Sequence, residues 1–148
     1  MLNWPTALAH LKDRESIRLL TGALENGNWQ VRRAAFDALC ERGPVAVPVI
    51  LEALNDTSDE IIWRVVLVLG SLRTPGAVEP LMFLLGRSGV IRECAIWALG
   101  EIGDARSSAS LLKFLNAPDS VVSREAADAI RKIGEQNGRF PHLLSPDQ

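Results

Sequence analysis

Ile-Arg-Glu-Cys-Ala-Ile-Trp-Ala-Leu-Gly-Glu-Ile-Gly-Asp, residues 91–104, contains one of four related segments in this chain. The apolar residue near its middle, Leu99, has equivalents at Leu39, Leu69 and Ile130, at intervals of 30, 30 and 31 residues. A second set recurs at intervals of 30, 31 and 30 residues: Leu24, Leu54, Leu85 and Leu115. A fixed period of this length is typical of stacked supersecondary units rather than of one globular core.

Each unit is predicted to be a helix, a turn and a second helix. The first helix has apolar residues at steps of three and four, and it follows a residue that favours the N-cap position: Asn28, Ser58, Ser88 and Asp119. Arg73 stands at the expected end of one first helix, and glycines stand at the others: Gly43, Gly103 and Gly134. The second helices are expected to begin near Pro44 and Pro75, where a missing N–H costs little.

The chain is therefore predicted to be all-α, a solenoid of about four stacked, antiparallel helix pairs with no strand. Residues 1–135 are expected to form this single repeat domain. Its N-terminal repeat is degenerate: Ile17, Leu20 and Leu24 predict a second helix, whose partner around residues 5–11 is short and irregular. Residues 136–148 form a tail that is expected either to cap the last helix or to be disordered.

The segments at 31–39 and 91–104 resemble HEAT-like repeats of the short phycobilisome-lyase type, and the resemblance covers roughly residues 13–134. It implies a right-handed α-solenoid. In that family an arginine of the first helix and an aspartate of the turn often form a ladder between repeats. Matching residues here are Arg32, Arg92, Asp104 and Asp13, whereas Ile62 and Ser123 replace the arginine in two units.

The resemblance also implies several activities that the residues themselves do not support. Bilin lyases of this family attach pigments to antenna proteins, but the repeat alone does not carry that activity. Deoxyhypusine hydroxylases use His-Glu metal pairs, and this chain has no His-Glu dipeptide and only two distant histidines, His10 and His142. DNA glycosylases built from such repeats use a basic groove, which the charge of this chain argues against.

Composition favours a cytoplasmic, non-enzymatic protein. The 148 residues carry a formal net charge of −2, and no basic stripe of the kind that binds nucleic acid is visible. Cys40 and Cys94 are too few for a disulfide framework. No signal peptide, phosphate loop, nucleophile–base pair or metal-ligand spacing is present. No catalytic residue, metal or cofactor is therefore expected, and the acidic cluster Asp56, Asp59 and Glu60 is interpreted as a solvated helix start.

An apolar patch interrupts the outward side of the first helices. One outward column reads Arg33, Trp63, Glu93 and Arg124, and the next reads Asp37, Leu67, Trp97 and Asp128. Trp63 and Leu67 are i, i+4 neighbours, and Trp97 is the lateral equivalent of Leu67. These three residues, Trp63, Leu67 and Trp97, are the predicted outer patch, a candidate partner-binding site. The alternative is that helix twist turns the rings partly inward, or that the tail covers them.

The second helices are expected to form an inner face of mixed charge. Its candidate partner-binding residues are Arg18, Glu52, Glu79, Phe83 and Lys113, with Phe83 as the anchor of a concave peptide site.

These features predict a protein-interaction scaffold or adaptor, because stacked repeats present an extended surface. The expected partner is another protein, and a homodimer through the outer patch is an alternative; no membrane or nucleic-acid partner is expected. Two other functions stay open: a partner-dependent subunit of a bilin lyase or another enzyme complex, and a nucleic-acid-binding repeat protein, which the charge disfavours.

Overall fold

The computed structural model describes residues 4–56 and 58–138, and the side chains of residues 13–55 and 58–138. Every regular element in these ranges is helical, in this order: α1 (Trp4–Ala23), α2 (Trp29–Arg42), η1 (Gly43–Ala46), α3 (Val47–Asp56), α4 (Asp59–Leu72), η2 (Pro75–Ala77), α5 (Val78–Leu84), α6 (Val90–Ile102), η3 (Ala105–Ser107), α7 (Ser108–Leu112) and α8 (Ser120–Gln136). The elements η1, η2 and η3 are short 3₁₀ turns that lead into the second helices. The all-helical prediction is confirmed.

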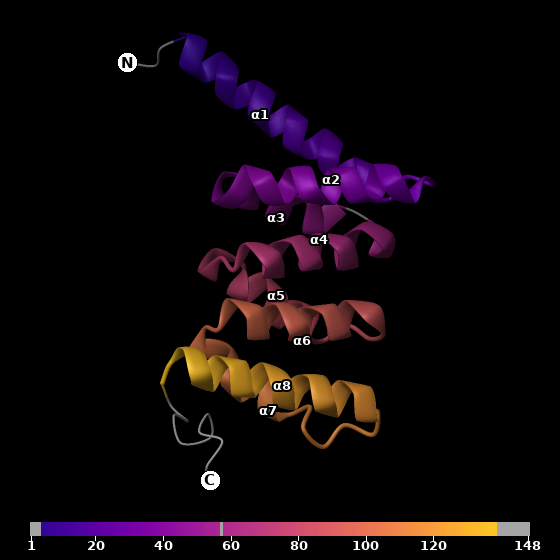
Figure 1. Ribbon diagram of the computed structural model, residues 1–148, viewed down its shortest axis with the longest axis vertical. Helices are drawn as coiled ribbons and strands as arrows, with labels where there is room; N and C mark the ends of the chain where they lie inside the picture. The colour runs from indigo at the N-terminus through magenta and orange to yellow at the C-terminus, as the bar shows by residue number, and fades with distance from the viewer. Residues whose placement is uncertain (1–3, 57, 139–148) are drawn as a thin grey trace.

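The helices form a two-layered stack. α2, α4, α6 and α8 lie side by side in one layer, and α3, α5 and α7 lie behind it (Figure 1). α4 packs extensively against α6, and α6 packs extensively against α8. The predicted solenoid is confirmed, and three complete pairs (α2–α3, α4–α5 and α6–α7) lie between α1 and α8 in the described residues. None of these helices has both the length and the apolar character needed to cross a bilayer.

The N-terminal repeat differs from the prediction. α1 is a single continuous helix from Trp4 to Ala23, and it crosses α2 obliquely (Figure 1). The predicted short, irregular partner around residues 5–11 is therefore wrong. Pro5 lies at the start of the helix, where the ring is tolerated, and residues 6–21 contain neither glycine nor proline to end it. The predicted tail begins at Gln136, the last residue of α8, and its residues 139–148 lie outside the described ranges.

Two of the four predicted N-caps have the expected side-chain hydrogen bond. Asn28 accepts from the backbone N–H of Gln30, and Asp119 accepts from that of Val121. Ser58 occupies the N-cap of α4, but its hydroxyl instead donates to Glu25 at 2.9 Å. The prediction of a Ser88 cap is wrong, because Gly89 with φ of 66° takes the N-cap position and α6 begins at Val90.

The helix ends follow the prediction in three of the four repeats. Gly43 and Gly103 are C-caps, and Arg73 takes the left-handed conformation (φ 52°) at the end of α4. Gly134 is instead buried inside α8. The helix continues past it because Asn137 caps the end, where its amide Nδ2 donates to the carbonyls of Ile133 and Gly103 at 2.7 and 2.8 Å.

The core lies between the two layers and repeats with the period of the sequence. Leu39, Leu69 and Leu99 are fully buried. The small-residue column of the first helices is buried throughout: Ala35, Val65, Ala95 and Ala126. Because each unit contributes the same positions, the core continues along the whole stack.

Neighbouring first helices approach each other closely at two glycines. A Cβ added at Gly70 would lie 2.9 Å from the Cα of Ala98, and one added at Gly100 would lie 2.8 Å from the Cα of Ala129. The equivalent positions between α2 and α4 are Cys40 and Val68. Their larger side chains prevent the same approach, and α2 contacts α4 far less than α4 contacts α6.

The Arg–Asp ladder implied by the family resemblance does not form among the described residues. Arg32 donates to the carbonyl of Asn26 at 2.7 Å, and Arg92 donates to the carbonyl of Leu85 at 3.0 Å. Asp104 accepts from Arg106 within the same turn. The matching aspartate of the first repeat, Asp13, pairs with Arg42 at 3.0 Å. Each arginine of the pattern therefore stabilises the preceding loop instead of joining neighbouring repeats.

Candidate interaction surface

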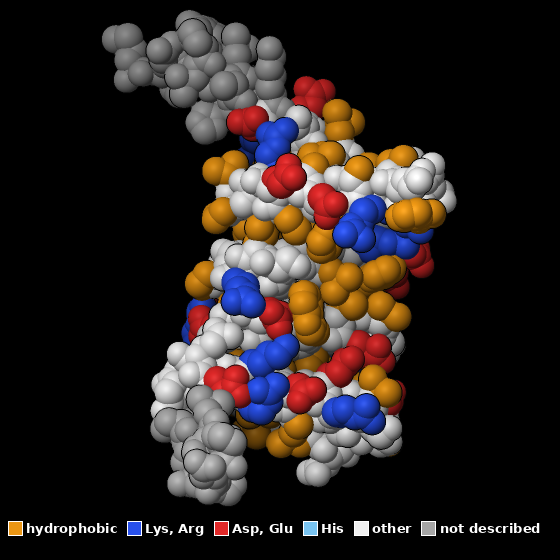
Figure 2. Space-filling view, in the orientation of Figure 1, with side chains coloured by type: hydrophobic (Ala, Val, Ile, Leu, Met, Phe, Trp, Pro, Cys, Tyr) orange, Lys and Arg blue, Asp and Glu red, His pale blue; other side chains and the backbone are white. Residues whose placement is uncertain are grey.

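The predicted outer patch lies on the α4–α6 part of the first-helix layer. Trp63 and Leu67 belong to α4 and Trp97 belongs to α6, and all three side chains are half-buried. Hydrophobic side chains gather over α4 and the adjoining part of α6 on this face (Figure 2). The two indole rings also pack against the buried core. The rings are therefore turned partly inward, while part of each remains at the surface.

Gly70 of α4 leaves room for the indole ring of Trp97. A Cβ added at Gly70 would lie 2.6 Å from Cζ3 of Trp97, so the indole covers the bare backbone of α4. Leu67 has no place among the side chains that pack against the core. Leu67 is thus the member of the patch whose removal disturbs the fold least.

Charged residues bound the patch at both ends of the layer. On α2 the equivalents of Trp63 and Leu67 are Arg33 and Asp37, which are exposed and pair with each other at 3.5 Å. On α8 the equivalents are Arg124 and Asp128, both exposed. Within these two outward columns, the apolar side chains therefore lie on α4 and α6.

A hollow of about 170 Å³ lies beside Trp63, and its walls include Asp59, Glu60 and Val90. The guanidinium of Arg64 stands 4.4 Å from the centre of the Trp63 ring and pairs with Glu60 at 3.3 Å. Asp59 pairs with Arg87 at 2.6 Å. Two members of the acidic cluster are therefore engaged in ion pairs near the start of α4; the side chain of the third, Asp56, lies outside the described ranges.

A second hollow, of about 270 Å³, lies between α4, α6 and α8. Its lining comprises Leu67, Glu93, Cys94, Trp97 and Glu125. We refer to it as the Trp97 groove. Burial, followed by the nearby charges of Glu125 and Glu93, raises the pKa of Cys94 to about 11. The thiol is therefore protonated at neutral pH, and a nucleophilic role is not supported.

Glu125 is the unusual group in the Trp97 groove. Its Oε2 atom is buried and has no hydrogen-bond partner in the structure. Burial and the neighbouring carboxylates, first Glu93 and then Asp119 and Asp128, raise the pKa of Glu125. Glu125 was not among the predicted site residues. In the repeat register it follows Ala34, Arg64 and Cys94, a column with no other acid, so the sequence pattern gave no signal for it.

The inner face brings together only part of its predicted set. Arg14 and Arg18 of α1 both pair with Glu52 of α3, at 2.9 and 3.4 Å respectively. The hydrogen bond from Arg14 and its positive charge lower the pKa of Glu52, and Arg18 adds a smaller effect in the same direction. These charges therefore tie α1 to α3.

The other predicted inner residues are more dispersed. Glu79 lies 3.9 Å from Arg106, Lys113 is exposed, and the side chain of Phe83 is 82% exposed on α5. Phe83 is the most exposed large apolar side chain in the described residues. The inner-side helices α5 and α7 are short, with 7 and 5 residues.

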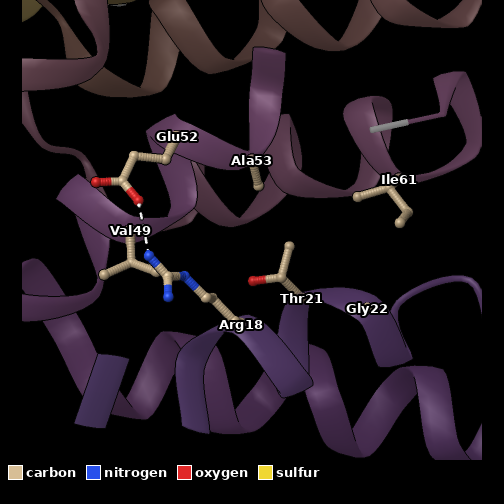
Figure 3. A pocket seen from close by; sticks show the side chains of 7 residues that line it. All are labelled: Arg18, Thr21, Gly22, Val49, Glu52, Ala53 and Ile61. Carbon is tan, nitrogen blue, oxygen red and sulfur yellow. Dashed lines mark hydrogen bonds and ion pairs between the residues drawn. The ribbon is translucent and has the colours of Figure 1, made fainter. Parts of the chain in front are cut away.

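A cavity of about 330 Å³ between α1, α3 and α4 was not predicted (Figure 3). Its lining comprises Arg18, Thr21, Gly22, Val49, Glu52, Ala53 and Ile61. The signal in the sequence was a pair of small residues on facing helices, Gly22 and Ala53, which leave the space unfilled. Its charged lining residues, Arg18 and Glu52, pair with each other. The rest of the lining is mainly apolar or small.

The sequence profile of HEAT repeats matches residues 6–62, 47–131 and 84–145, and together these matches cover nearly the whole chain. The chain belongs to the HEAT-repeat family. The matches concern HEAT repeats in general, and they do not indicate the phycobilisome-lyase type. A comparison with curated proteins gave no match.

Solved structures with a similar arrangement include natural and designed repeat proteins. Human deoxyhypusine hydroxylase in complex with glycerol is 24% identical over 89% of this HEAT-repeat chain, with a TM-score of 0.68, and the match covers 49% of the hydroxylase. An engineered protein is 23% identical over 80% of this chain and 62% of its own, with a TM-score of 0.57. A designed armadillo-repeat protein in complex with the peptide (KR)4 is 20% identical over 86% of this chain and 70% of its own, with a TM-score of 0.57.

These similarities concern the fold. The chain spans about half the length of the hydroxylase structure, and the identities are too low to transfer an activity. Within residues 13–55 and 58–138, no three His, Cys, Asp or Glu side chains are arranged to hold a metal ion. Both histidines, His10 and His142, lie outside the described side chains.

Proposed function

We propose that this HEAT-repeat protein is a non-enzymatic interaction scaffold that binds another protein through the outer face of α4 and α6. The observation that carries the proposal is the apolar outer patch of Trp63, Leu67 and Trp97, placed where the flanking repeats present charged, exposed residues. Tryptophan is enriched at the centres of protein interfaces, and exposed apolar patches commonly mark interaction sites.

The shape of the surface supports the same function. Hollows of about 170 and 270 Å³ flank the patch, so it presents relief into which a partner's side chains fit. The designed armadillo-repeat protein with a similar fold was solved in complex with a peptide, which supports a peptide or protein as the partner. The net charge of −2 and the carboxylates around the patch disfavour nucleic acid as the partner.

The first measurement is the oligomeric state of the wild-type protein by sedimentation velocity. A monomer is expected, because the proposed partner is a different protein. A dimer that Leu67→Lys converts to a monomer would contradict that expectation and assign the patch to self-association.

The second measurement tests the face. Partners captured from an extract of the source cells by the tagged wild-type protein are compared with those captured by Leu67→Lys. Placing a cation in the apolar patch is expected to weaken a specific partner at least tenfold, roughly 1.4 kcal/mol, as for a central interface residue. Leu19→Lys is the matched control, because Leu19 is 70% exposed on α1, away from the patch.

A separate substitution, at Phe83, tests whether the partner binds the inner face instead. Phe83→Lys is expected to leave capture unchanged. Loss of the same partner in Phe83→Lys but not in Leu67→Lys would contradict the proposal and move the site to the inner face. Circular dichroism of each variant checks that the helical fold is intact.

A further inference from the structure

The Trp97 groove combines apolar walls with negative charge. Leu67 and Trp97 supply the apolar surface, Glu93 and Glu125 supply the carboxylates, and the lining contains no basic side chain. Its volume of about 270 Å³ lies below the range of pockets for drug-sized ligands and suits one long side chain.

Glu125 lacks a partner inside the chain. Its buried Oε2 accepts no hydrogen bond, and neither Glu125 nor Glu93 forms an ion pair with any described residue. A carboxylate held in this way is destabilised by its lost hydration and by like charges. A cation bound in the groove from outside would oppose the repulsion among these acids.

Three basic residues of the adjoining helices form contacts elsewhere, and a fourth, Arg124 of α8, is exposed and does not line the groove. Lys132 of α8 donates to Glu101 at 2.5 Å, and Arg92 of α6 donates to the carbonyl of Leu85 at 3.0 Å. Arg131 pairs with Glu135 at 2.5 Å. The Trp97 groove is therefore lined by carboxylates without a basic side chain, although basic residues lie close to it in the sequence.

The neighbouring repeat contains the arrangement that the groove lacks. On α4, the guanidinium of Arg64 lies over the ring of Trp63 and pairs with Glu60. On α6, Trp97 lies in the register of Leu67, one turn further along its helix than Trp63. It has Glu93 one turn before it and Glu125 beside it across the groove, and no basic side chain lines this groove. Both places have an indole close to a carboxylate, and only the place on α4 also has a cation among its described residues.

We propose, on the basis of the interaction role above, that the Trp97 groove binds an arginine side chain of the partner protein. The aliphatic stem packs on Leu67 and Trp97, and the guanidinium faces Glu93 and Glu125. Arginine suits the groove better than lysine, because a planar guanidinium stacks on an indole and donates several hydrogen bonds at once. The occupant is therefore a basic segment of a protein, with one arginine as its anchor.

The test uses fluorescence anisotropy with fluorescein-labelled peptides at physiological ionic strength. The probe is a peptide of alternating arginine and alanine, compared with peptides that have lysine or glutamate in place of arginine. The wild-type protein is expected to bind the arginine peptide most tightly, the lysine peptide more weakly and the glutamate peptide not at all.

The decisive variant is Glu125→Gln, which keeps the shape of the side chain and removes its charge. It is expected to weaken the arginine peptide roughly tenfold. Glu41→Gln makes the same change of net charge on α2, where Glu41 is exposed and forms no ion pair with a described residue, and it is expected to have little effect. Because the buried, unpaired charge is removed, Glu125→Gln is also expected to melt no lower than the wild type, so a loss of binding is not a loss of fold.

Equal weakening by Glu125→Gln and Glu41→Gln would overturn the inference, because it would show attraction to net charge alone. Absence of any preference for arginine over glutamate would overturn it as well. If the arginine peptide does not bind while Leu67→Lys still abolishes capture of the protein partner, the arginine site is contradicted and the proposed scaffold role is not. If the peptide binds as expected but Leu67→Lys leaves capture unchanged, the proposal that the partner binds the outer face of α4 and α6 is contradicted.

Discussion

At the scale of single residues, two glutamates show how packing sets their charge behaviour. Glu101 of α6 accepts a hydrogen bond from Lys132 at 2.5 Å and a second from Arg73 at 3.3 Å. These partners, Lys132 first, lower the pKa of Glu101. Glu125 of the facing α8 has no such partner, and burial raises its pKa. One carboxylate thus joins three elements of the stack, while the other forms no ion pair with a described residue.

Glu101→Gln is expected to lower the free energy of unfolding at neutral pH by about 1 kcal/mol, as for a partly exposed ion pair. The folded-state pKa lies below the unfolded value. The contribution is therefore present above the unfolded pKa and is lost as the pH falls through the folded pKa. Urea denaturation of wild type and variant at neutral and acidic pH measures the difference.

The difference between Glu101→Gln and wild type should shrink toward zero in acid. Glu41→Gln serves as the control, because it removes a carboxylate that is exposed and forms no ion pair with a described residue. A deficit for Glu101→Gln that stays constant from neutral to acidic pH would instead indicate lost packing.

At the scale of helices, glycine determines how closely the first helices approach. Gly70 faces Ala98 and Gly100 faces Ala129, at distances that leave no room for a methyl group. A glycine inside a helix normally costs up to about 1 kcal/mol relative to alanine. Here that cost is offset by direct contact between helix backbones, and these contacts make the α4–α6–α8 layer the most tightly packed part of the stack.

Gly100→Ala is expected to destabilise the protein by about 1–3 kcal/mol, because the new methyl group collides with the backbone of α8. The better helix propensity of alanine does not compensate for this overpacking. Gly22→Ala is the matched control: Gly22 lies in α1 with nothing within 4 Å of an added Cβ, and the change is expected to stabilise by about 0.4–1 kcal/mol. Denaturant midpoints check both, and a neutral or stabilising Gly100→Ala would contradict the proposed role of the close approach.

At the scale of the whole molecule, the stack is uneven. α4, α6 and α8 share extensive contacts, whereas α2 meets α4 sparsely and α1 packs mainly on α2 and α3. Repeat proteins are stabilised by the sum of neighbour interfaces, so a weak interface permits one end to open independently. We therefore expect the molecule to divide energetically between α3 and α4.

Amide hydrogen exchange is expected to show this division directly. The buried amides of α4 and α6 should exchange at least tenfold more slowly than those of α2, a difference of about 1.4 kcal/mol in opening free energy. The measurement is native-state exchange followed by mass spectrometry of peptides from each helix. Equal protection of α2 and α6 would show that the stack opens as one unit, contrary to the contacts.

The sequence by itself determined the repeat, the helical class and the stacking order, because period, apolar steps and most caps depend on residues close in the chain. It also predicted an outward patch of Trp63, Leu67 and Trp97, and the structure shows these residues half-buried on α4 and α6. It could not show that Gly134 lies inside a helix, since the cap that extends α8 depends on Asn137 reaching another helix end. Only the tertiary structure revealed the unpaired Glu125, because the absence of a partner is a property of the helices around it.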